Sequence, residues 1–426
     1  MVEGVAMSHD PMGAINELLS CAEQLARSGN LAGALQSYEE VLALSPENPR
    51  ALNGLGNRAL SRGDGKAAAA YFERAVRSDP KAPPLWLNLA LARRMCGDAQ
   101  GELQALDDAL TVDPYFVIAL LQKAQWLERY GRRAEAVRAY RALLDAAPPL
   151  EGLPPAMRQA LEHGRALVDA DNAALEANIR SAVGEEATDS VRFDHALEIM
   201  AGKRQVYHPK PVGLHFPYLP PVQYFDRALF PWFAELEAAA PVIRQELEGL
   251  VAAGHAGAPY VRIAAGQPEN QWKDLNNSLD WSAMFLWRDG KPVQEVQAQC
   301  PMTADLLRRI PMLDIPSRGP TAMFSTLQPH TRIPPHHGVT NVRSVVHLPL
   351  IVPGGCGFRV GSETRHWQEG VAWAFDDTIE HEAWNDSGQT RVILIIDAWN
   401  PYLTEAEKDL LRKANEVMHQ FGQGQV

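Results

Sequence analysis

The first third of this chain repeats itself with a step of 34 residues. Four columns keep that step: a glycine, a proline, an aromatic residue or leucine, and a small residue. The members are Gly29, Gly63, Gly97 and Gly131; Pro46, Pro80, Pro114 and Pro148; Tyr38, Phe72, Leu106 and Tyr140; and Ala22, Gly56, Ala90 and Ala124. Such a period indicates a solenoid, in which each unit buries its apolar face only against its neighbours.

Each column has a physical role in a pair of packed helices. The glycine follows the first helix, where a left-handed C-cap conformation favours it. The small residue lets the two helices approach, the aromatic residue fills the space between them, and the proline ends the second helix. The pattern resembles tetratricopeptide repeats and predicts four of them over residues 14–148. Residues 149–204 combine a proline-rich hinge with a further helix, which we expect to cap the solenoid.

Solenoids of this kind usually bind peptides or proteins in a concave groove. Asn53, Asn57 and Asn88 fall on first helices and either line such a groove or are solvated polar positions. The same units could instead serve dimerisation or packing. The sequence therefore leaves both the partner and the oligomeric state open.

Composition narrows the class of protein. The chain has 426 residues, enough for two or three domains, and a net charge of −12. This charge argues against nucleic acid and anionic membrane surfaces as partners, because both attract clustered Lys and Arg. There is no run of about 18 apolar residues that predicts a membrane span, and we expect no secretory signal at the start. The four cysteines form no Cys-x-x-Cys pair, so we expect free thiols in a reducing, cytoplasmic setting.

From about Tyr207 the helical period ends and short β-type runs begin. FPWFAELEAAAPVIRQELEGLVAA predicts one helix, or two joined at Pro241. Turn residues then separate the runs TAMFSTLQP, RSVVHLPLIVP, CGFRVGSETRHW, GVAWAFDD, IEHEAWN and TRVILIIDAW, which predict an all-β sandwich or barrel. A last helix opens at a capping box of Thr404 and Glu407. The second domain is therefore predicted over residues 205–420.

Histidines gather in this β region and are candidate metal ligands: His330, His336, His337, His347 and His381. Imidazoles on facing strands suit Fe(II), Zn or Cu. Arg391 follows the last of them across a turn, so it returns beside that strand. A guanidinium inside a barrel needs an anion, because an unpaired buried charge is costly. A metal and an interior arginine together favour a small dicarboxylate as ligand, although the pattern does not choose between His336 and His337.

Several separated segments resemble one known family. PHHGVTNVRSVVHLPL, FDDTIEHEAWN and TRVILIIDAWNPYLT, with YFDRALFPW and LDWSAMFLW upstream, are similar to the aspartyl/asparaginyl β-hydroxylase family. The resemblance implies a double-stranded β-helix, jelly-roll or cupin-like in character, behind the α-solenoid. It also implies an oxygenase that uses Fe(II), 2-oxoglutarate and O₂, and some members carry tetratricopeptide repeats in front.

The resemblance also implies roles for individual residues. His336 and His381 match the iron ligands, and Gly338 stands where most non-haem iron oxygenases have a carboxylate, so water is expected in that place. The other matched positions are Arg391 for the distal carboxylate of 2-oxoglutarate, Ser325 and His347 for further cosubstrate contacts, Asp377 for a carboxylate near the metal, and Trp281 and Arg343 for the substrate site. His337 is expected on the opposite side of its strand.

Two departures from the family pattern bear on the substrate. Val345 stands where relatives often have arginine, and Asn276 and Asn277 precede Trp281 where relatives can carry an arginine that grips the substrate carboxylate. We expect a hydroxylase of an Asp/Asn-type or other side chain in a peptide or protein, recruited by the repeats. The alternatives are a hydroxylase of a free amino acid or a lipid, and a non-catalytic repeat protein with a silent barrel.

Overall fold

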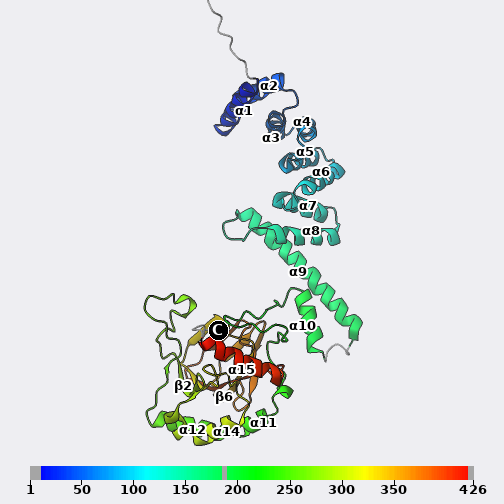
Figure 1. The fold of residues 1–426 in the computed structure, drawn as a ribbon. Helices are drawn as coiled ribbons and strands as arrows, with labels where there is room; N and C mark the ends of the chain where they lie inside the picture. The colour runs from blue at the N-terminus through cyan, green and yellow to red at the C-terminus, as the bar shows by residue number, and fades with distance from the viewer. Residues whose placement is uncertain (1–10, 185–189, 421–426) are drawn as a thin grey trace, which may run out of the picture. The chain divides into compact units, whose positions relative to one another are not determined.

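The computed structural model describes residues 11–184 and 190–420. The chain divides into two compact units, Met1–Gly202 and Lys203–Val426 (Figure 1). The first unit is helical and the second is built on antiparallel sheets, so the fold class is an α-solenoid followed by a double-stranded β-helix.

Pairs of antiparallel helices make up the first unit. They are α1 (Pro11–Arg27), α2 (Leu31–Leu44), α3 (Pro49–Ser61), α4 (Gly65–Ser78), α5 (Pro83–Met95), α6 (Ala99–Val112), α7 (Val117–Arg129) and α8 (Arg133–Ala146). Each glycine of the repeat follows the first helix of its pair with a positive φ, from +71° to +84°. This is the left-handed C-cap that the sequence predicted.

Close helix packing explains the small-residue column. A Cβ atom added to Gly56 would meet the ring of Phe72, which is fully buried on α4. Asn53 and Asn88 lie on α3 and α5, and the amide of Asn88 donates a hydrogen bond of 2.8 Å to Asn53. After the repeats come α9 (Pro155–Val183), which packs on α8, and α10 (Val191–Met200).

Two facing sheets form the second unit. The larger sheet has the strand order β1-β2-β4-β11-β6-β9, with β3 paired to β2, and the smaller has the order β5-β10-β7-β8. The strands are β1 (Ala258–Pro259), β2 (Trp281–Arg288), β3 (Lys291–Pro292), β4 (Ala322–Leu327), β5 (Thr331–His336), β6 (Arg343–Ile351), β7 (Cys356–Val360), β8 (Glu363–Arg365), β9 (Trp373–Phe375), β10 (His381–Asn385) and β11 (Arg391–Trp399). From β4 to β11 the chain passes back and forth between the two sheets, as in a double-stranded β-helix, except that the consecutive strands β7 and β8 both belong to the smaller sheet.

Strand β5 was not among the strands expected from the sequence. It contains Pro334 and Pro335, which read as strand breakers because proline donates no ladder hydrogen bond. In the structure β5 pairs only with β10 and lies at an edge of the smaller sheet, where proline is tolerated. The fold therefore admits a strand that local propensity rejects.

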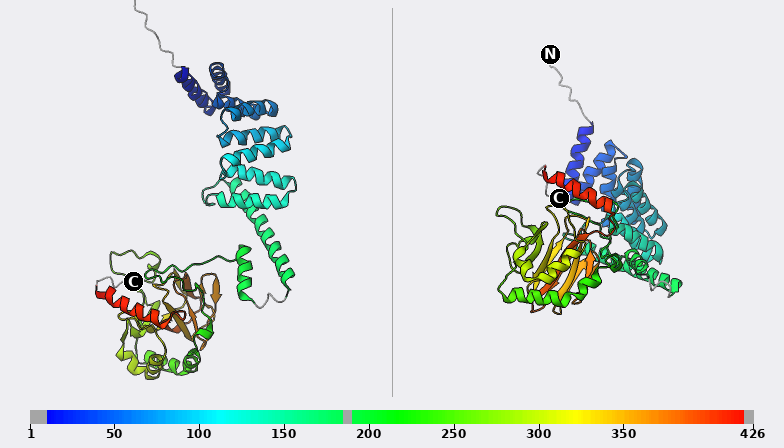
Figure 2. Two further views of the ribbon diagram at one scale, coloured as in Figure 1. Left: turned by 45° about the vertical axis from the view of Figure 1, so that its right-hand side comes forward. Right: turned by 60° about the horizontal axis from the view of Figure 1, so that its bottom comes forward.

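Helices cover the outer face of the larger sheet. They are α11 (Phe233–Ala238), α12 (Ala240–Ala252), α13 (Gln294–Gln299) and α14 (Pro301–Arg309) (Figures 1 and 2). Phe233 and Leu247 from these helices share one buried cluster with Phe324 and Leu394 from the sheet. The two expected helical halves around Pro241 are thus separate helices. The inner face of the sheet is left for the cavity between the sheets.

A last helix, α15 (Glu405–Gln420), begins at the predicted capping box. The backbone N–H of Thr404 donates to Glu407 at 2.8 Å, and the N–H of Glu407 donates back to the Thr404 hydroxyl at 3.3 Å. In the described part of the chain, no helix has the length and apolar character to cross a membrane. Cys21 and Cys96 are exposed free thiols, and Cys300 and Cys356 are buried ones.

Candidate active site

A cavity of about 580 Å³ lies between the two sheets. Side chains from the inner face of the larger sheet form its floor, because alternate residues of a strand point to one face. On β11 these are Arg391, Ile393, Ile395 and Asp397. The floor runs about 20 Å along this strand at the usual rise per residue. A cavity of this size can hold a small cosubstrate together with part of a second ligand.

His336 and His381 lie side by side on the paired strands β5 and β10 of the smaller sheet. Their Cα atoms are partners in the β5–β10 register, and their ring centroids are 4.0 Å apart. Nδ1 of His336 donates to the carbonyl of Pro334 at 2.8 Å, and Nδ1 of His381 donates to the carbonyl of Ile379 at 3.0 Å. Since a carbonyl can only accept, both Nδ1 atoms carry the proton. Each ring therefore keeps a lone pair on Nε2, the atom that can bind a metal.

Burial keeps these rings neutral. It lowers the pKa of His381 well below its ordinary value, and the neighbouring His336 acts in the same direction. Burial also lowers the pKa of His336, although the backbone hydrogen bond and the Asp377 carboxylate oppose the shift. A neutral imidazole is the form that ligates metals, so the pair is ready to bind a cation near neutral pH.

The Asp377 carboxylate occupies the space of a side chain at position 338. A Cβ atom added to Gly338 would overlap the carboxyl group of Asp377, and the backbone N–H of Gly338 donates to the carbonyl of Asp377 at 2.5 Å. One carboxylate oxygen of Asp377 accepts from Arg343, and the other is buried without a hydrogen-bond partner. A free acceptor therefore lies beside the two histidines, on a residue distant in sequence from Gly338.

Arg391 is a buried cation without a counter-ion. Its side chain is 1% exposed, and its Nε and Nη1 atoms have no hydrogen-bond partner. Burial lowers its pKa to about 10, so the guanidinium remains charged at neutral pH. The Cζ atom of Arg391 lies 4.9 Å from the ring centroid of Trp367, which is a favourable cation–π contact. An unpaired guanidinium facing a cavity is stable only when an anion pairs with it.

The remaining residues that the family resemblance singled out line the same cavity. The indole N–H of Trp281 donates to the hydroxyl of Ser325 at 3.2 Å, and both are buried. His347 is 3% exposed and its Nδ1 has no partner. Burial lowers the pKa of His347 well below its ordinary value, and the charge of Arg391 lowers it further. Its neutral ring can give or accept a hydrogen bond to a ligand held by Arg391.

Arg343 lines the cavity, but other residues already neutralise it. It donates to Asp377 at 2.5 Å and to Asp397 at 2.9 Å. Both partners are buried, so the three side chains form an ion cluster in which carboxylates outnumber the guanidinium, although Nε of Arg343 has no hydrogen-bond partner. A guanidinium with two carboxylate partners has little left to offer a substrate anion.

Of the other positions noted in the sequence, His337 lies in a different place from the one expected. His337 was expected on the opposite side of the strand, yet it lines the cavity too, since β5 ends at His336. Its Nδ1 donates to the carbonyl of Thr378 at 3.0 Å. His330 lies exposed in the turn between β4 and β5. Asn276 fixes a loop: it accepts from the N–H of Ile263 at 2.8 Å.

Sequence reasoning missed two aromatic residues beside the histidines. The ring of Trp272 meets His336 edge-on, with centroids 5.0 Å apart, and Tyr260 packs on Trp281 at 4.2 Å. Both precede the first long strand, in segments without a periodic pattern. It also missed Asp397, although this residue continues the alternation that begins at Arg391. Among the described residues, no group of three or more His, Cys, Asp or Glu side chains is arranged to hold a metal.

Two family models match the chain. Residues 237–401 match the model described as Aspartyl/Asparaginyl beta-hydroxylase. Residues 22–83 and 54–115 match Tetratricopeptide repeat. The first match covers all strands of the smaller sheet and both histidines of the pair. The second covers repeats whose glycines have the left-handed conformation.

The chain is similar to curated hydroxylases. The aspartyl/asparaginyl beta-hydroxylase of Mus musculus is 26% identical over 425 residues, which span 92% of this chain and 55% of the relative. The ornithine lipid ester-linked acyl 2-hydroxylase of Rhizobium tropici is 38% identical over 191 residues, 44% of this chain and 63% of the relative. This chain thus spans little more than half of the mouse protein's length. The solved structure of MamA protein aligns with 45% of this chain and 96% of its own, with a TM-score of 0.32 and 18% identity.

Proposed function

We propose that this chain is a hydroxylase dependent on Fe(II) and 2-oxoglutarate, because residues 237–401 match the aspartyl/asparaginyl beta-hydroxylase model and tetratricopeptide repeats match in front of them. A ferrous ion with 2-oxoglutarate supplies the oxidation: one atom of O₂ enters a substrate C–H bond, the other enters succinate, and CO₂ leaves. The observation that carries the proposal is the combination of two paired imidazoles with free Nε2 atoms and an unpaired buried guanidinium in one cavity.

The residues present fit a ferrous ion. His336 and His381 would hold it through Nε2, because their Nδ1 atoms are held by backbone carbonyls. With Gly338 in the usual carboxylate place, the protein supplies two ligands and leaves more open positions than the common two-histidine, one-carboxylate site. The free oxygen of Asp377 is available to accept a hydrogen bond from a water in one of those positions.

The residues present also fit 2-oxoglutarate. Arg391 would pair with the carboxylate at the far end of this cosubstrate. That carboxylate would supply the hydrogen-bond partner that Nε and Nη1 of Arg391 lack. Ser325 and His347 would add neutral hydrogen bonds beside it. A cosubstrate fixed at one end by a rigid fork reaches the metal in a single orientation, which is how positioning lowers a barrier.

The aromatic side chains restrict water at the reacting centre. Trp272 meets the ring of His336, and Trp281 lies with its centroid 6.4 Å from the same ring. A dry, shaped pocket keeps a strong oxidant from side reactions, which is the part of such chemistry that belongs to the protein. We assign Trp281 and Trp272 this shielding role.

The relatives suggest two classes of substrate. One relative is named for aspartyl and asparaginyl residues and the other for the acyl chain of an ornithine lipid. For a peptide or protein substrate, the repeat solenoid would serve as the recruiting surface, and for either class it can recruit a protein partner in the cytoplasm. The choice between the classes depends on the side chains that line the substrate half of the cavity.

Anaerobic titration tests the proposal. The full chain is titrated with Fe(II), with 2-oxoglutarate, and with both, and visible absorption of the ternary complex is recorded. We expect a new band only when both are present, in the wild type and in His366→Ala, which changes an exposed histidine. Succinate should then form when O₂ is admitted. A wild type that binds neither would instead support a silent barrel in a repeat-based interaction protein.

Replacing a proposed ligand sharpens the same experiment. His336→Ala should abolish the band and the succinate, while the thermal unfolding of the metal-free chain changes little. If His336→Ala kept both signals and His337→Ala lost them, the ligand assignment would be wrong. In that case the second histidine of the pair PHHG would hold the metal.

A further inference from the structure

The cavity continues well beyond the space that a five-carbon cosubstrate needs. Arg391 and Ser325 lie at one end of its floor, and the floor then passes Met323, Ile395 and Val345 toward the opposite end. The three middle residues are apolar: Met323 on β4 is the register partner of Ile395 on β11, and Val345 on β6 is the partner of Asp397, two residues further along β11. The middle of the floor is therefore apolar, and the floor ends at Asp397, which pairs with Arg343 at 2.9 Å.

Helix α15 forms a wall of this outer part. Leu411, Asn415 and Met418 line the cavity, and their spacing of four and three residues puts them on one face of the helix. Leu411 belongs to a buried cluster with Leu313 and Ile315, which also line the cavity. The match to the hydroxylase family ends at residue 401, before this helix begins. The family model therefore gives no information about this wall.

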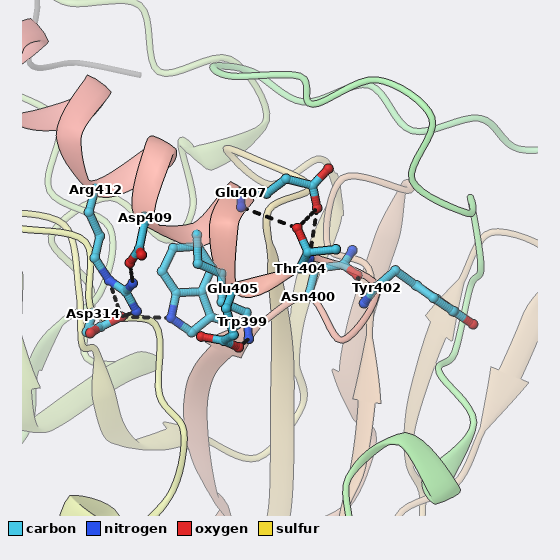
Figure 3. Close-up of polar contacts among 10 residues, drawn as sticks. Asp314, Trp399, Asn400, Tyr402, Thr404, Glu405, Glu407, Asp409 and Arg412 are labelled. Atoms are coloured by element: carbon cyan, nitrogen blue, oxygen red, sulfur yellow. Dashed lines mark hydrogen bonds and ion pairs between the residues drawn. The ribbon is translucent and has the colours of Figure 1, made fainter.

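Polar contacts fix α15 in this position. Asp314 accepts from the indole of Trp399 at 2.7 Å and from two nitrogens of Arg412 at 3.1 and 2.8 Å (Figure 3). The capping box of Thr404 and Glu407 sets the start of the helix, as the same figure shows. The apolar wall is therefore held in place before any ligand arrives, which is the condition for a specific pocket.

Charged groups line the outer end of the cavity, and several of them are engaged with one another. Arg288 lies 3.7 Å from Asp289. The Arg343 guanidinium is neutralised by Asp377 and Asp397. The side-chain N–H of Asn415 already donates to the carbonyl of Pro316 at 2.5 Å. Val345 brings a hydrocarbon group to the floor. A peptide backbone or a side-chain carboxylate placed over the apolar middle of the floor would lose hydrogen bonds to water without replacement.

We propose that this outer part is an acyl channel: a pocket, floored by Met323, Ile395 and Val345 and walled by Leu411 and Met418 of α15, that takes an unbranched aliphatic chain. The inference rests on the proposed function, because it identifies the substrate of the same site. The chain lies along the floor, and the carbon that passes the histidine pair is the one to be hydroxylated. Met418 sets how much chain the channel accepts.

Binding without turnover tests the channel. A dansyl-labelled undecanoate is added to the metal-free full chain, and its fluorescence reports binding. Met418→Trp fills the channel and should weaken binding by at least about tenfold, the effect expected for bulk added to an apolar pocket. Val417→Trp adds still more bulk to the adjacent position, which is 53% exposed on another face of α15, and should leave binding unchanged.

Chain length gives a second measurement. Unlabelled fatty acids of increasing length compete with the probe. Met418→Ala should move the tightest-binding length toward longer chains and Met418→Trp toward shorter ones. Equal effects of Met418→Trp and Val417→Trp, or no probe binding to the wild type, would overturn the proposal. Competition by a leucine-rich decapeptide as strong as that of the best fatty acid would overturn it in favour of a peptide substrate.

The two proposals fail separately. If the probe binds as expected but Fe(II), 2-oxoglutarate and a bound fatty acid give no succinate, the oxygenase chemistry fails and the channel stands. If succinate forms with another substrate and the probe does not bind, the channel fails and the oxygenase stands. Competition by phospholipid vesicles rather than by a soluble acyl thioester identifies the source of the chain as a membrane lipid, and the reverse identifies a carrier.

Discussion

In the solenoid, the buried carboxylate of Glu102 lies between the guanidinium groups of Arg94 and Arg129, at 4.0 and 3.5 Å. In the β domain, the buried guanidinium of Arg391 has Nε and Nη1 without any partner. Other atoms of the same cavity lack a partner among the described residues, and they include Nδ1 of His347, Nε of Arg343 and one oxygen of Asp377. Glu102 thus contributes to the cohesion of the solenoid, whereas Arg391 remains available to a ligand in the cavity.

This difference between Glu102 and Arg391 indicates which buried groups belong to a ligand site. A buried polar group without a partner costs free energy, so its persistence indicates a ligand that supplies the missing partner. We expect changes in the solenoid to act on stability alone, because a solenoid's stability is approximately a sum of repeat and nearest-neighbour terms. In the β domain, the proposed chemistry would depend on the same buried side chains whose missing partners cost free energy. Four changes test this contrast.

Loss of a proposed iron ligand should give the largest effect. In His381→Ala we expect succinate formation to fall by at least about a thousandfold, as when one member of a group that acts as a unit is removed. Iron retention after gel filtration, measured by metal analysis, should fall with it. The solenoid should unfold at an unchanged temperature. Unchanged turnover in His381→Ala would contradict the ligand assignment.

A core substitution in the solenoid should strongly lower stability and leave turnover nearly unchanged. Phe72→Ala removes a fully buried ring from α4 and should lower the free energy of unfolding of the repeats by about 3–5 kcal/mol. Succinate formation without a protein partner should stay within twofold of the wild type. Tyr115→Ala, at a residue that is 76% exposed, is the control and should change neither quantity. Loss of turnover in Phe72→Ala would show that the two units are not separable.

Replacing the unpaired arginine should lower activity and raise stability together. In Arg391→Met the KM for 2-oxoglutarate should rise by about 10–100-fold, the value of a charge-assisted hydrogen-bonded pair. The metal-free domain should gain about 1–3 kcal/mol in urea unfolding, because a buried unpaired charge is gone. Arg332→Met removes an exposed ion pair with Asp386 and serves as the control. A variant that loses stability would indicate that Arg391 has a structural partner in solution.

Acid should weaken the β domain more than the solenoid, with a smaller effect. Burial lowers the pKa of His336, His347 and His381 in the fold, so the unfolded chain takes up protons first as the pH falls through about 6.5. Their stabilising contribution is complete above that pH and is lost below it.

Two buried carboxyl groups oppose this loss. Burial raises the pKa of Asp376 to about 6 and also raises the pKa of Asp397, so the folded state takes up protons there as the pH falls. The net loss for the metal-free β domain should be on the order of 1–2 kcal/mol per pH unit between pH 6.5 and 5.5. The solenoid buries no histidine among its described residues. Equal acid sensitivity of both units in hydrogen exchange would contradict the contrast.

Local signals in the sequence were enough for the solenoid. A glycine at a helix end and an aromatic residue opposite a small one act within a single repeat of 34 residues, so their spacing carries the packing. The β strands with alternating or apolar runs were also predictable, as was the capping box of α15. Strand β5 was not, because its two prolines are acceptable only at a sheet edge, and no local pattern shows which strand will be an edge.

The sequence by itself determined the repeat architecture, the β character of the second half and, through its resemblance to a family, a set of candidate residues. The tertiary structure alone decided how those residues combine. It put the Asp377 carboxylate into the space beside Gly338, paired Arg343 with two aspartates while leaving Arg391 unpaired, and brought α15 to the cavity. The physical reason is range. Capping and helix pairing act between near neighbours in the chain, whereas burial and charge pairing depend on groups that only the folded sheets bring together.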